Sequence, residues 1–186
     1  MSKKNIEDIY PLSPVQQGML FHSLSVPETG MYVEQLVCTL HGDLDVATFE
    51  RAWTAVLAQH SVLRTLFVWN RGEKPLQIVR RSAGLPFNRY DWRGLSDIEQ
   101  ERRLDVLLEE DRRCGFNLSE APLMRLTLVH TAAEHFQLLW TSHHLILDGW
   151  SLPIILKEVF DFYQAFRRGR ELSLEPTKPF HDTSTG

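Results

Sequence analysis

The stretch SHHLILDGWS, residues 142–151, follows an apolar run that is typical of a β-strand. Neighbouring side chains on a strand point to opposite faces, so His143 and His144 are predicted to diverge. Gly149 favours a turn, and Ser151 is a suitable cap for the helix that the following apolar residues predict. The stretch therefore predicts a strand, a tight turn and a helix, with two histidines where the strand ends.

The rest of the chain alternates between predicted strands and helices without an internal repeat, which indicates an α/β fold. Two of the strands, joined by a short polar turn, are expected to form a hairpin. Ser96 and Glu99 predict a capping box. Strands are expected over 32–41, 62–69, 75–80, 86–92, 124–131 and 135–143, and helices from Pro14, from Asp45, over 96–113 and from Ser151 to Arg167.

Length and composition indicate an ordinary globular domain: 186 residues, of which 43% are hydrophobic and 24% charged. The net charge of −4 gives no support to a nucleic-acid or membrane-surface partner. Cys38 and Cys114 lack metal-type spacing and fit a reducing, cytoplasmic setting. The first residues do not read as a signal peptide, and we see no run apolar enough to cross a bilayer.

A candidate base, a carboxylate and a helix start lie within ten residues of one another. These are the kinds of group that an acyl-transfer site uses. His144 is the candidate base, Asp148 the orienting acid, and the free amides of the helix start favour a developing negative charge. A metal site is the competing interpretation, because His144 and Asp148 would share a face if both lay on a helix. Gly149 and Ser151 place the helix after Asp148, and spacing offers no third ligand, so no metal is expected.

Three motifs in order resemble those of nonribosomal peptide synthetase condensation domains. They are YPLSPVQQGMLFHSL at 10–24, QHSVLRTLF at 59–67, and HHLILDG at 143–149, which fits the pattern HHxxxDG. The first motif is closest to the subtype that takes a D-configured donor. In the second, Gln59 and Ser61 replace the usual arginine and glutamate. The resemblance covers nearly the whole chain.

This resemblance implies half of a chloramphenicol acetyltransferase-like fold, with a mixed β-sheet flanked by helices. The family domain has two lobes, and residues 1–180 correspond to the N-terminal lobe. Residues 181–186 are interpreted as a disordered or artificially added tail. We expect the lobe alone to be inactive, and the apolar face left by the missing C-terminal lobe favours self-association.

The reaction implied is peptide-bond formation. A donor acyl or peptidyl thioester is attacked by the amine of an acceptor aminoacyl thioester, and both are carried on phosphopantetheine arms. The expected partners are donor and acceptor peptidyl carrier protein domains. No directly bound cofactor is implied.

The resemblance also assigns roles within the third motif. His144 is the expected catalytic residue, which orients the amine and removes its proton as the tetrahedral species forms. Gly149 permits close approach, and its amide is a candidate oxyanion donor. His143 is expected to belong to the framework rather than to the catalytic machinery.

The acidic residue of the motif is assigned a structural role. Asp148 is expected to pair with an arginine, and Arg64 of the second motif is the candidate; the alternative is that Asp148 faces solvent. Trp150 and Ser151 adjoin the motif and are candidates for the substrate channel.

Three alternatives stay open from the sequence. An epimerisation domain shares the histidine motif but begins differently from residues 10–24. Stand-alone acyltransferases carry the motif nearer their C-terminus. A non-catalytic docking module would not need the intact histidine motif.

Overall fold

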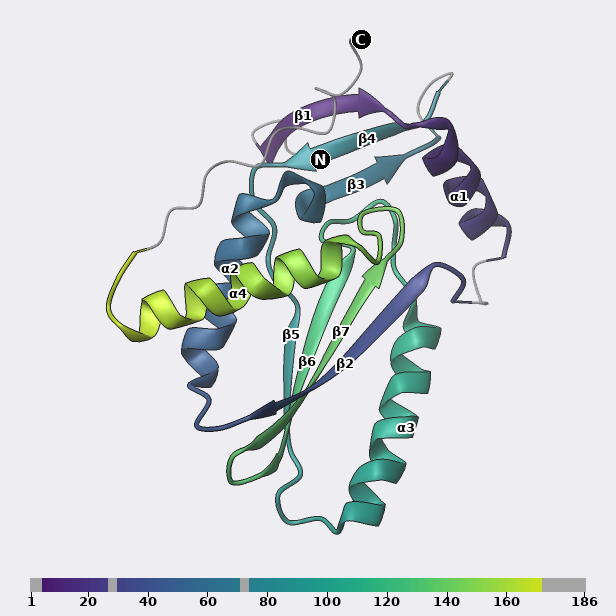
Figure 1. Ribbon diagram of the computed structural model, residues 1–186. Coiled ribbons are helices and arrows are strands. Elements are labelled where there is room, and N and C mark those ends of the chain that lie inside the picture. Colours follow the sequence, from purple (N-terminus) through teal and green to yellow (C-terminus); the bar gives the residue numbers. More distant parts are fainter. Residues whose placement is uncertain (1–4, 27–29, 71–73, 172–186) are drawn as a thin grey trace.

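The computed structural model describes residues 5–26, 30–70 and 74–171 (Figure 1). The expected tail at 181–186 lies outside these residues. The elements in chain order are β1 (Ile6–Pro11), α1 (Pro14–Ser25), β2 (Val33–His41), α2 (Val46–Gln59), the 3-10 helix η3 (Ser61–Arg64), β3 (Thr65–Val68), β4 (Leu76–Arg80), β5 (Phe87–Asp91), α3 (Asp97–Cys114), β6 (Met124–Ala132), β7 (His135–His143) and α4 (Ser151–Arg167).

The larger sheet has four strands in the order β2-β7-β6-β5. β7 runs antiparallel to both of its neighbours, whereas β5 is parallel to β6. The expected β6–β7 hairpin and mixed sheet are therefore confirmed. Since β7 lies between β2 and β6, its last residues are held on both sides, and the histidine pair is attached to the best-anchored strand of the sheet.

Helices cover both faces of this sheet, and the alternation along β7 assigns them. Trp140 points toward α2, where its ring centroid lies 4.9 Å from that of Trp53, and α4 packs against α2 on the same face. The next residue, Thr141, points the opposite way and donates a hydrogen bond to Asp111 of α3 at 2.6 Å. The expected arrangement of helices around a mixed sheet is thus confirmed (Figure 1).

A second sheet of three strands, in the order β1-β4-β3, packs beside the first (Figure 1). The strand β1 was not predicted, and residues 62–69 were expected to form one strand where the structure has η3 followed by β3. Arg64 explains the interruption. Its buried guanidinium donates hydrogen bonds to the Glu7 carboxylate and the Leu57 carbonyl. The helical turn η3 places the Arg64 side chain where it can make both bonds.

The helices α1 and α3 each begin after a serine whose side chain caps the helix. Ser13 and Gln16 form a full capping box at α1. At α3, Ser96 accepts from the Glu99 amide, but the box is only half made, because the Glu99 carboxylate binds Arg102 instead. The hydrogen bond from Arg102, with a second from a neighbouring arginine, lowers the pKa of Glu99 to about 2.

Candidate functional site

The end of β7 separates the two histidines as the strand alternation predicts. β2 pairs with β7 so that Val33 lies opposite His143 and Glu34 opposite Ser142. The pairing continues one step further, because the His144 amide donates to the Tyr32 carbonyl at 2.8 Å. The backbone of both histidines is therefore fixed by β2, and their rings leave the strand on different faces.

His143 is a buried, neutral histidine. Its exposed fraction is 3%, and its Nδ1 accepts the Leu145 amide hydrogen at 3.1 Å, which leaves the ring proton on Nε2. Burial, followed by the nearby His144, lowers its pKa to about 4. These contacts favour a framework role.

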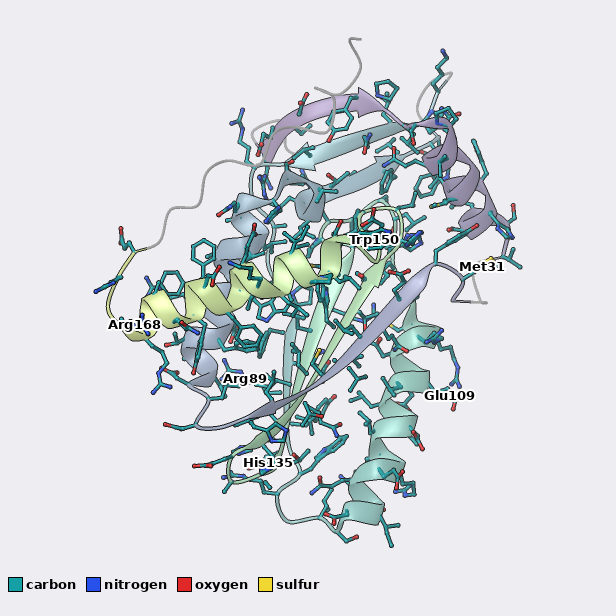
Figure 2. All side chains as sticks on the ribbon, viewed as in Figure 1. Met31, Arg89, Glu109, His135, Trp150 and Arg168 are labelled. Carbon is teal, nitrogen blue, oxygen red and sulfur yellow. The ribbon has the colours of Figure 1, made fainter. Side chains whose placement is uncertain are left out.

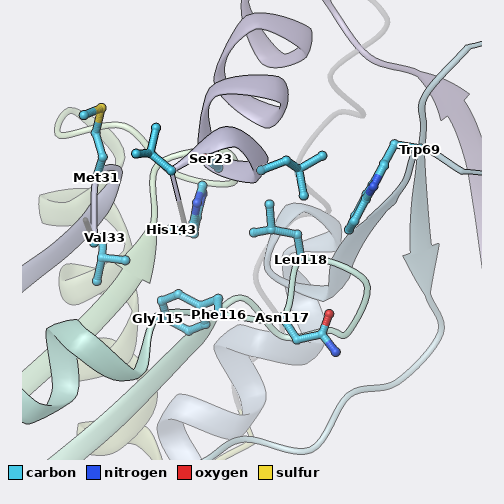
Figure 3. Close-up of a pocket in the computed structure, with 12 residues that line it drawn as sticks. Ser23, Met31, Val33, Trp69, Gly115, Phe116, Asn117, Leu118 and His143 are labelled. Atoms are coloured by element: carbon cyan, nitrogen blue, oxygen red, sulfur yellow. The ribbon is translucent and has the colours of Figure 1, made fainter. Parts of the chain in front are cut away.

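The His143 ring also borders a cavity of about 210 Å³, shown in Figure 3. Phe116 lies edge-on to the ring, with 6.3 Å between centroids. Across the cavity, Trp69 and Leu118 add apolar surface. Because the lining is largely apolar, the cavity suits an apolar group rather than an ion.

His144 lies on the other face and is partly open to solvent, with 30% of its side chain exposed. Its Nδ1 lies 3.0 Å from Oε1 of Glu34. On this side, β2 and the start of α4 border a hollow of about 390 Å³, whose lining includes Glu34, Ser142 and Gly149. An imidazole with one nitrogen beside a carboxylate and partial access to solvent is suited to accept a proton.

The expected pairing of Asp148 with Arg64 is wrong. Asp148 is exposed, and its Oδ1 accepts from the amide and hydroxyl of Ser151 at 2.9 and 2.6 Å. Arg64 instead binds Glu7 at 2.6 Å. The hydrogen bond from the Ser151 hydroxyl is the main reason that the pKa of Asp148 lies below its usual range. The alternative, that Asp148 faces solvent, is the one observed.

Asp148, rather than Ser151, caps α4. The helix begins at Ser151 as predicted, but the N-cap position is Trp150, which has no capping side chain. Because the Asp148 carboxylate takes the Ser151 amide, that amide is not free to stabilise an oxyanion. Trp150 is 88% exposed beside the motif (Figure 2), and Ser151 is half-buried.

Gly149 is not required by contacts within the described chain. A Cβ placed there would meet no described atom within 4 Å, and the φ angle does not lie in the left-handed region. Its amide takes part in none of the described hydrogen bonds. The open space beside Gly149 is compatible with close approach of a substrate.

Neither a metal site nor a membrane-spanning helix is found among the described residues. Within them, no group of three or more histidine, cysteine, aspartate or glutamate residues could hold a metal ion. His144 and Asp148 do not share a helix, since α4 starts only at Ser151. None of the helices over the described ranges has the length and apolarity to cross a membrane.

Sequence reasoning missed two residues next to the motif, Glu34 and Tyr32. Glu34 belongs to an ordinary-looking strand, and only the β2–β7 register brings it to His144. Tyr32 has a φ of 69°, which is unusual for a non-glycine residue. Its ring lies 6.2 Å from that of His143, and its hydroxyl bonds Nδ1 of His22.

The fold and the site together define a class of protein. A mixed sheet covered by helices, with a partly exposed histidine at the end of a central strand, is the architecture expected of an acetyltransferase-like lobe. The chain belongs to the condensation domain family, whose model matches residues 6–185. The resemblance drawn from the three motifs is thereby confirmed.

Curated relatives include proteins named as synthases of linear gramicidin and of bacitracin. Two linear gramicidin synthase subunits of Brevibacillus parabrevis are 45% and 46% identical to this chain, over 97% and 95% of its length. Bacitracin synthase 3 of Bacillus licheniformis is 38% identical over 97%. The chain spans only 2%, 4% and 3% of these three relatives.

Solved structures confirm the fold. The starter condensation domain of rhizomide synthetase RzmA matches with a TM-score of 0.81 and 20% identity, over 90% of this chain and 41% of that one. The first condensation domain of the calcium-dependent antibiotic synthetase, in complex with a substrate analogue, also gives 0.81, with 19% identity over 91% and 42% of the two chains. The chain therefore spans less than half of a solved condensation domain.

Proposed function

We propose that this chain is the N-terminal lobe of a nonribosomal peptide synthetase condensation domain. In the intact domain, a donor acyl or peptidyl thioester and an acceptor aminoacyl thioester meet, both carried on phosphopantetheine arms of carrier protein domains. Membership of the condensation domain family and the synthase relatives support this proposal. The observation that carries it is the partly exposed ring of His144 at the end of β7.

The reaction follows from the chemistry of the two substrates. The acceptor amine attacks the donor thioester carbonyl, a C–N bond forms, and the C–S bond breaks. One proton must leave the amine, and the departing thiolate takes up a proton. His144 takes the first proton on Nε2 and is regenerated as a proton is given to the thiolate, so no external acid, base or cofactor is consumed.

The magnitude of this contribution is limited by the amine itself. An α-amine has a pKa near 8, so roughly a tenth of it is already unprotonated at neutral pH. The gain from His144 therefore lies in orienting the amine and removing the proton as the tetrahedral species forms. General-base catalysis of this kind is worth about 10²–10⁴-fold. Gly149 borders the hollow on this face. Its amide has no hydrogen-bond partner among the described residues, and we assign it to the developing oxyanion.

The test is single-turnover peptide formation by the intact condensation domain with two loaded carrier proteins. His144→Ala should lower the rate by about 10²–10⁴-fold while leaving thermal unfolding unchanged. His135→Ala, at the exposed far end of the same strand (Figure 2), is the matched control and should retain the wild-type rate. A near-normal rate in His144→Ala would remove the general-base role.

The subtype is part of the proposal. The residues QGMLFHS of the first motif form most of α1. Their resemblance to the subtype that takes a D-configured donor is what supports this part of the proposal. Peptide formation from the D-donor, and much less from its L-epimer, is the expected outcome in the same assay. We also propose that the domain works in the cytoplasm, where the two free cysteines would stay reduced.

The remainder of the domain would pack beside this lobe. Trp150 and Ile154, on the last loop and on α4, are 88% and 59% exposed, which is unusual for such large apolar side chains. We propose that the C-terminal lobe covers part of this surface, and that the N-terminal lobe alone self-associates and is inactive.

A further inference from the structure

Glu34 is the acidic group that the β2–β7 register brings to His144. Glu34 lies opposite Ser142, and His144 follows Ser142 by two residues on the same face, so Glu34 and His144 are diagonal neighbours across the strands. Such neighbours are within reach of long side chains. Here Oε1 of Glu34 lies 3.0 Å from Nδ1 of His144.

Two atoms of this pair have no other hydrogen-bond partner among the described residues. Nδ1 of His144 and Oε2 of Glu34 are both shielded from solvent, and neither has an aligned hydrogen bond to any of the described residues. The Glu34 side chain as a whole is 38% exposed, so only its Oε2 is cut off from water. At 3.0 Å, the Glu34 carboxylate and the His144 ring are within hydrogen-bonding distance of each other.

The other titratable groups near the ring act less directly. His143 lies on the opposite face, and its pKa of about 4 leaves it neutral at physiological pH. Asp148 interacts electrostatically with His144, but its carboxylate is already engaged by Ser151. Glu34 is the carboxylate in direct contact with the His144 ring.

We propose that Glu34 is a positioning residue for His144. Its carboxylate keeps the ring proton on Nδ1, which leaves the Nε2 lone pair free to act as the base. The same negative charge balances the imidazolium that forms when Nε2 takes the proton from the acceptor amine. A base oriented by a neighbouring carboxylate is a recurring arrangement in acyl-transfer sites. The inference rests on the proposed function, since it assigns a partner to the same catalytic histidine.

The experiment compares Glu34→Gln with wild type in the intact condensation domain. Glutamine keeps the size and one acceptor oxygen but removes the charge. The single-turnover rate should fall by about 10–100-fold, with little change in the substrate concentration that gives half-maximal rate. The acidic limb of the rate–pH profile should move to lower pH, because a negative charge that favours the protonated ring is gone.

The matched control is Glu109→Gln, which makes the same change on the exposed surface of α3 (Figure 2). It should keep both the wild-type rate and the wild-type pH profile. A structural effect of Glu34→Gln would lower the thermal unfolding temperature without moving the pH profile, so the two readouts separate positioning from folding.

A second measurement does not depend on activity. The ¹⁵N NMR signals of the His144 ring in the unliganded domain should show the proton on Nδ1 in the wild type and a mixture of tautomers in Glu34→Gln. A wild-type ring protonated on Nε2, or an unchanged rate and pH profile in Glu34→Gln, would overturn this inference but leave the proposed function standing. Failure of the wild type to form peptide would overturn the proposed function and, with it, this assignment.

Discussion

The Asp111 carboxylate, which is largely shielded from solvent, is a main point of attachment between α3 and the sheet. The helix has no fully buried residue, so apolar packing holds it only in part. Asp111 accepts hydrogen bonds from Arg125 Nε at 2.5 Å, Thr141 Oγ1 at 2.6 Å and Gln35 Nε2 at 2.8 Å. These donors come from β6, β7 and β2, so one side chain joins α3 to three neighbouring strands.

Asp111→Asn should therefore destabilise the chain by about 3 kcal/mol. Side chains of Asp111 and Arg125 are only 9% and 15% exposed, and breaking a buried ion pair costs about 3–5 kcal/mol because the remaining charge is uncompensated. Asparagine keeps one acceptor oxygen, which places the estimate at the lower end. Urea unfolding followed by circular dichroism would show a midpoint lowered by about 1–2 M, since such a chain loses roughly 2 kcal/mol per molar urea.

The same carboxylate predicts a pH dependence. Burial alone would raise the pKa of Asp111, but the hydrogen bonds from Arg125, Thr141 and Gln35 outweigh it and hold the pKa below its ordinary value. The stabilisation is therefore complete above about pH 4, the ordinary value for an aspartate, and is lost as the pH falls through the lowered pKa. The difference between wild type and Asp111→Asn should stay constant above about pH 5 and shrink below about pH 4.

Two further variants make this prediction refutable. Glu109→Gln changes an exposed carboxylate of the same helix, paired with Arg113, and should alter stability by less than about 0.5 kcal/mol. Thr141→Val removes one donor at nearly constant volume and should cost about 1–2 kcal/mol if Asp111→Asn proves too unstable to purify. Equal stabilities of Asp111→Asn and Glu109→Gln would show that the network does not hold α3.

Two more predictions concern the histidine motif. Burial lowers the pKa of His143 to about 4, so as the pH falls the unfolded chain binds a proton on this histidine before the folded chain does. The free energy of unfolding should therefore fall by about 3 kcal/mol between about pH 6.5 and pH 4. Urea unfolding of wild type and His143→Gln across that range would test this, and the same change of stability with pH in both proteins would count against it. Asp148→Ala and Arg64→Lys should have additive effects on the free energy of unfolding, within about 0.5 kcal/mol, because the two residues bind different partners. A larger coupling energy in the double-mutant cycle would support the Asp148–Arg64 pairing that the motif suggested.

Most elements could be predicted from the sequence because their signals are local. Ser13 followed by Pro14, and Ser96 with Glu99, indicate helix starts through close neighbours in the sequence. β1 carried no such signal, since it is stabilised by pairing with β4, about 70 residues away. The prediction of a single strand at 62–69 was wrong for a related reason. The distant partners of the buried Arg64, one of them on β1, favour a helical turn over an extended backbone.

In the candidate site, too, the features set by strand alternation could be predicted from the local sequence, and the contacts between side chains could not. The motif and strand alternation were enough to separate His143 from His144, because that separation needs only consecutive residues on one strand. The partner of Asp148 was misassigned because a motif records which residues occur together, not which atoms meet. Here the closest donor is three residues away, in Ser151, and a local bond of this kind needs no distant arginine.

The backbone of Tyr32 shows why the face of His144 stays open. On a regular strand, the side chain opposite His144 would lie on the same face as Glu34 and would crowd the ring. At a φ of 69°, Tyr32 departs from that geometry, and its ring contacts His143 and His22 instead. A left-handed tyrosine costs about 1–2 kcal/mol, which the ring contacts and the hydrogen bond offset. The strain leaves His144 with a carboxylate neighbour on one side and access to solvent on the other, which is what a base that must meet an incoming amine requires.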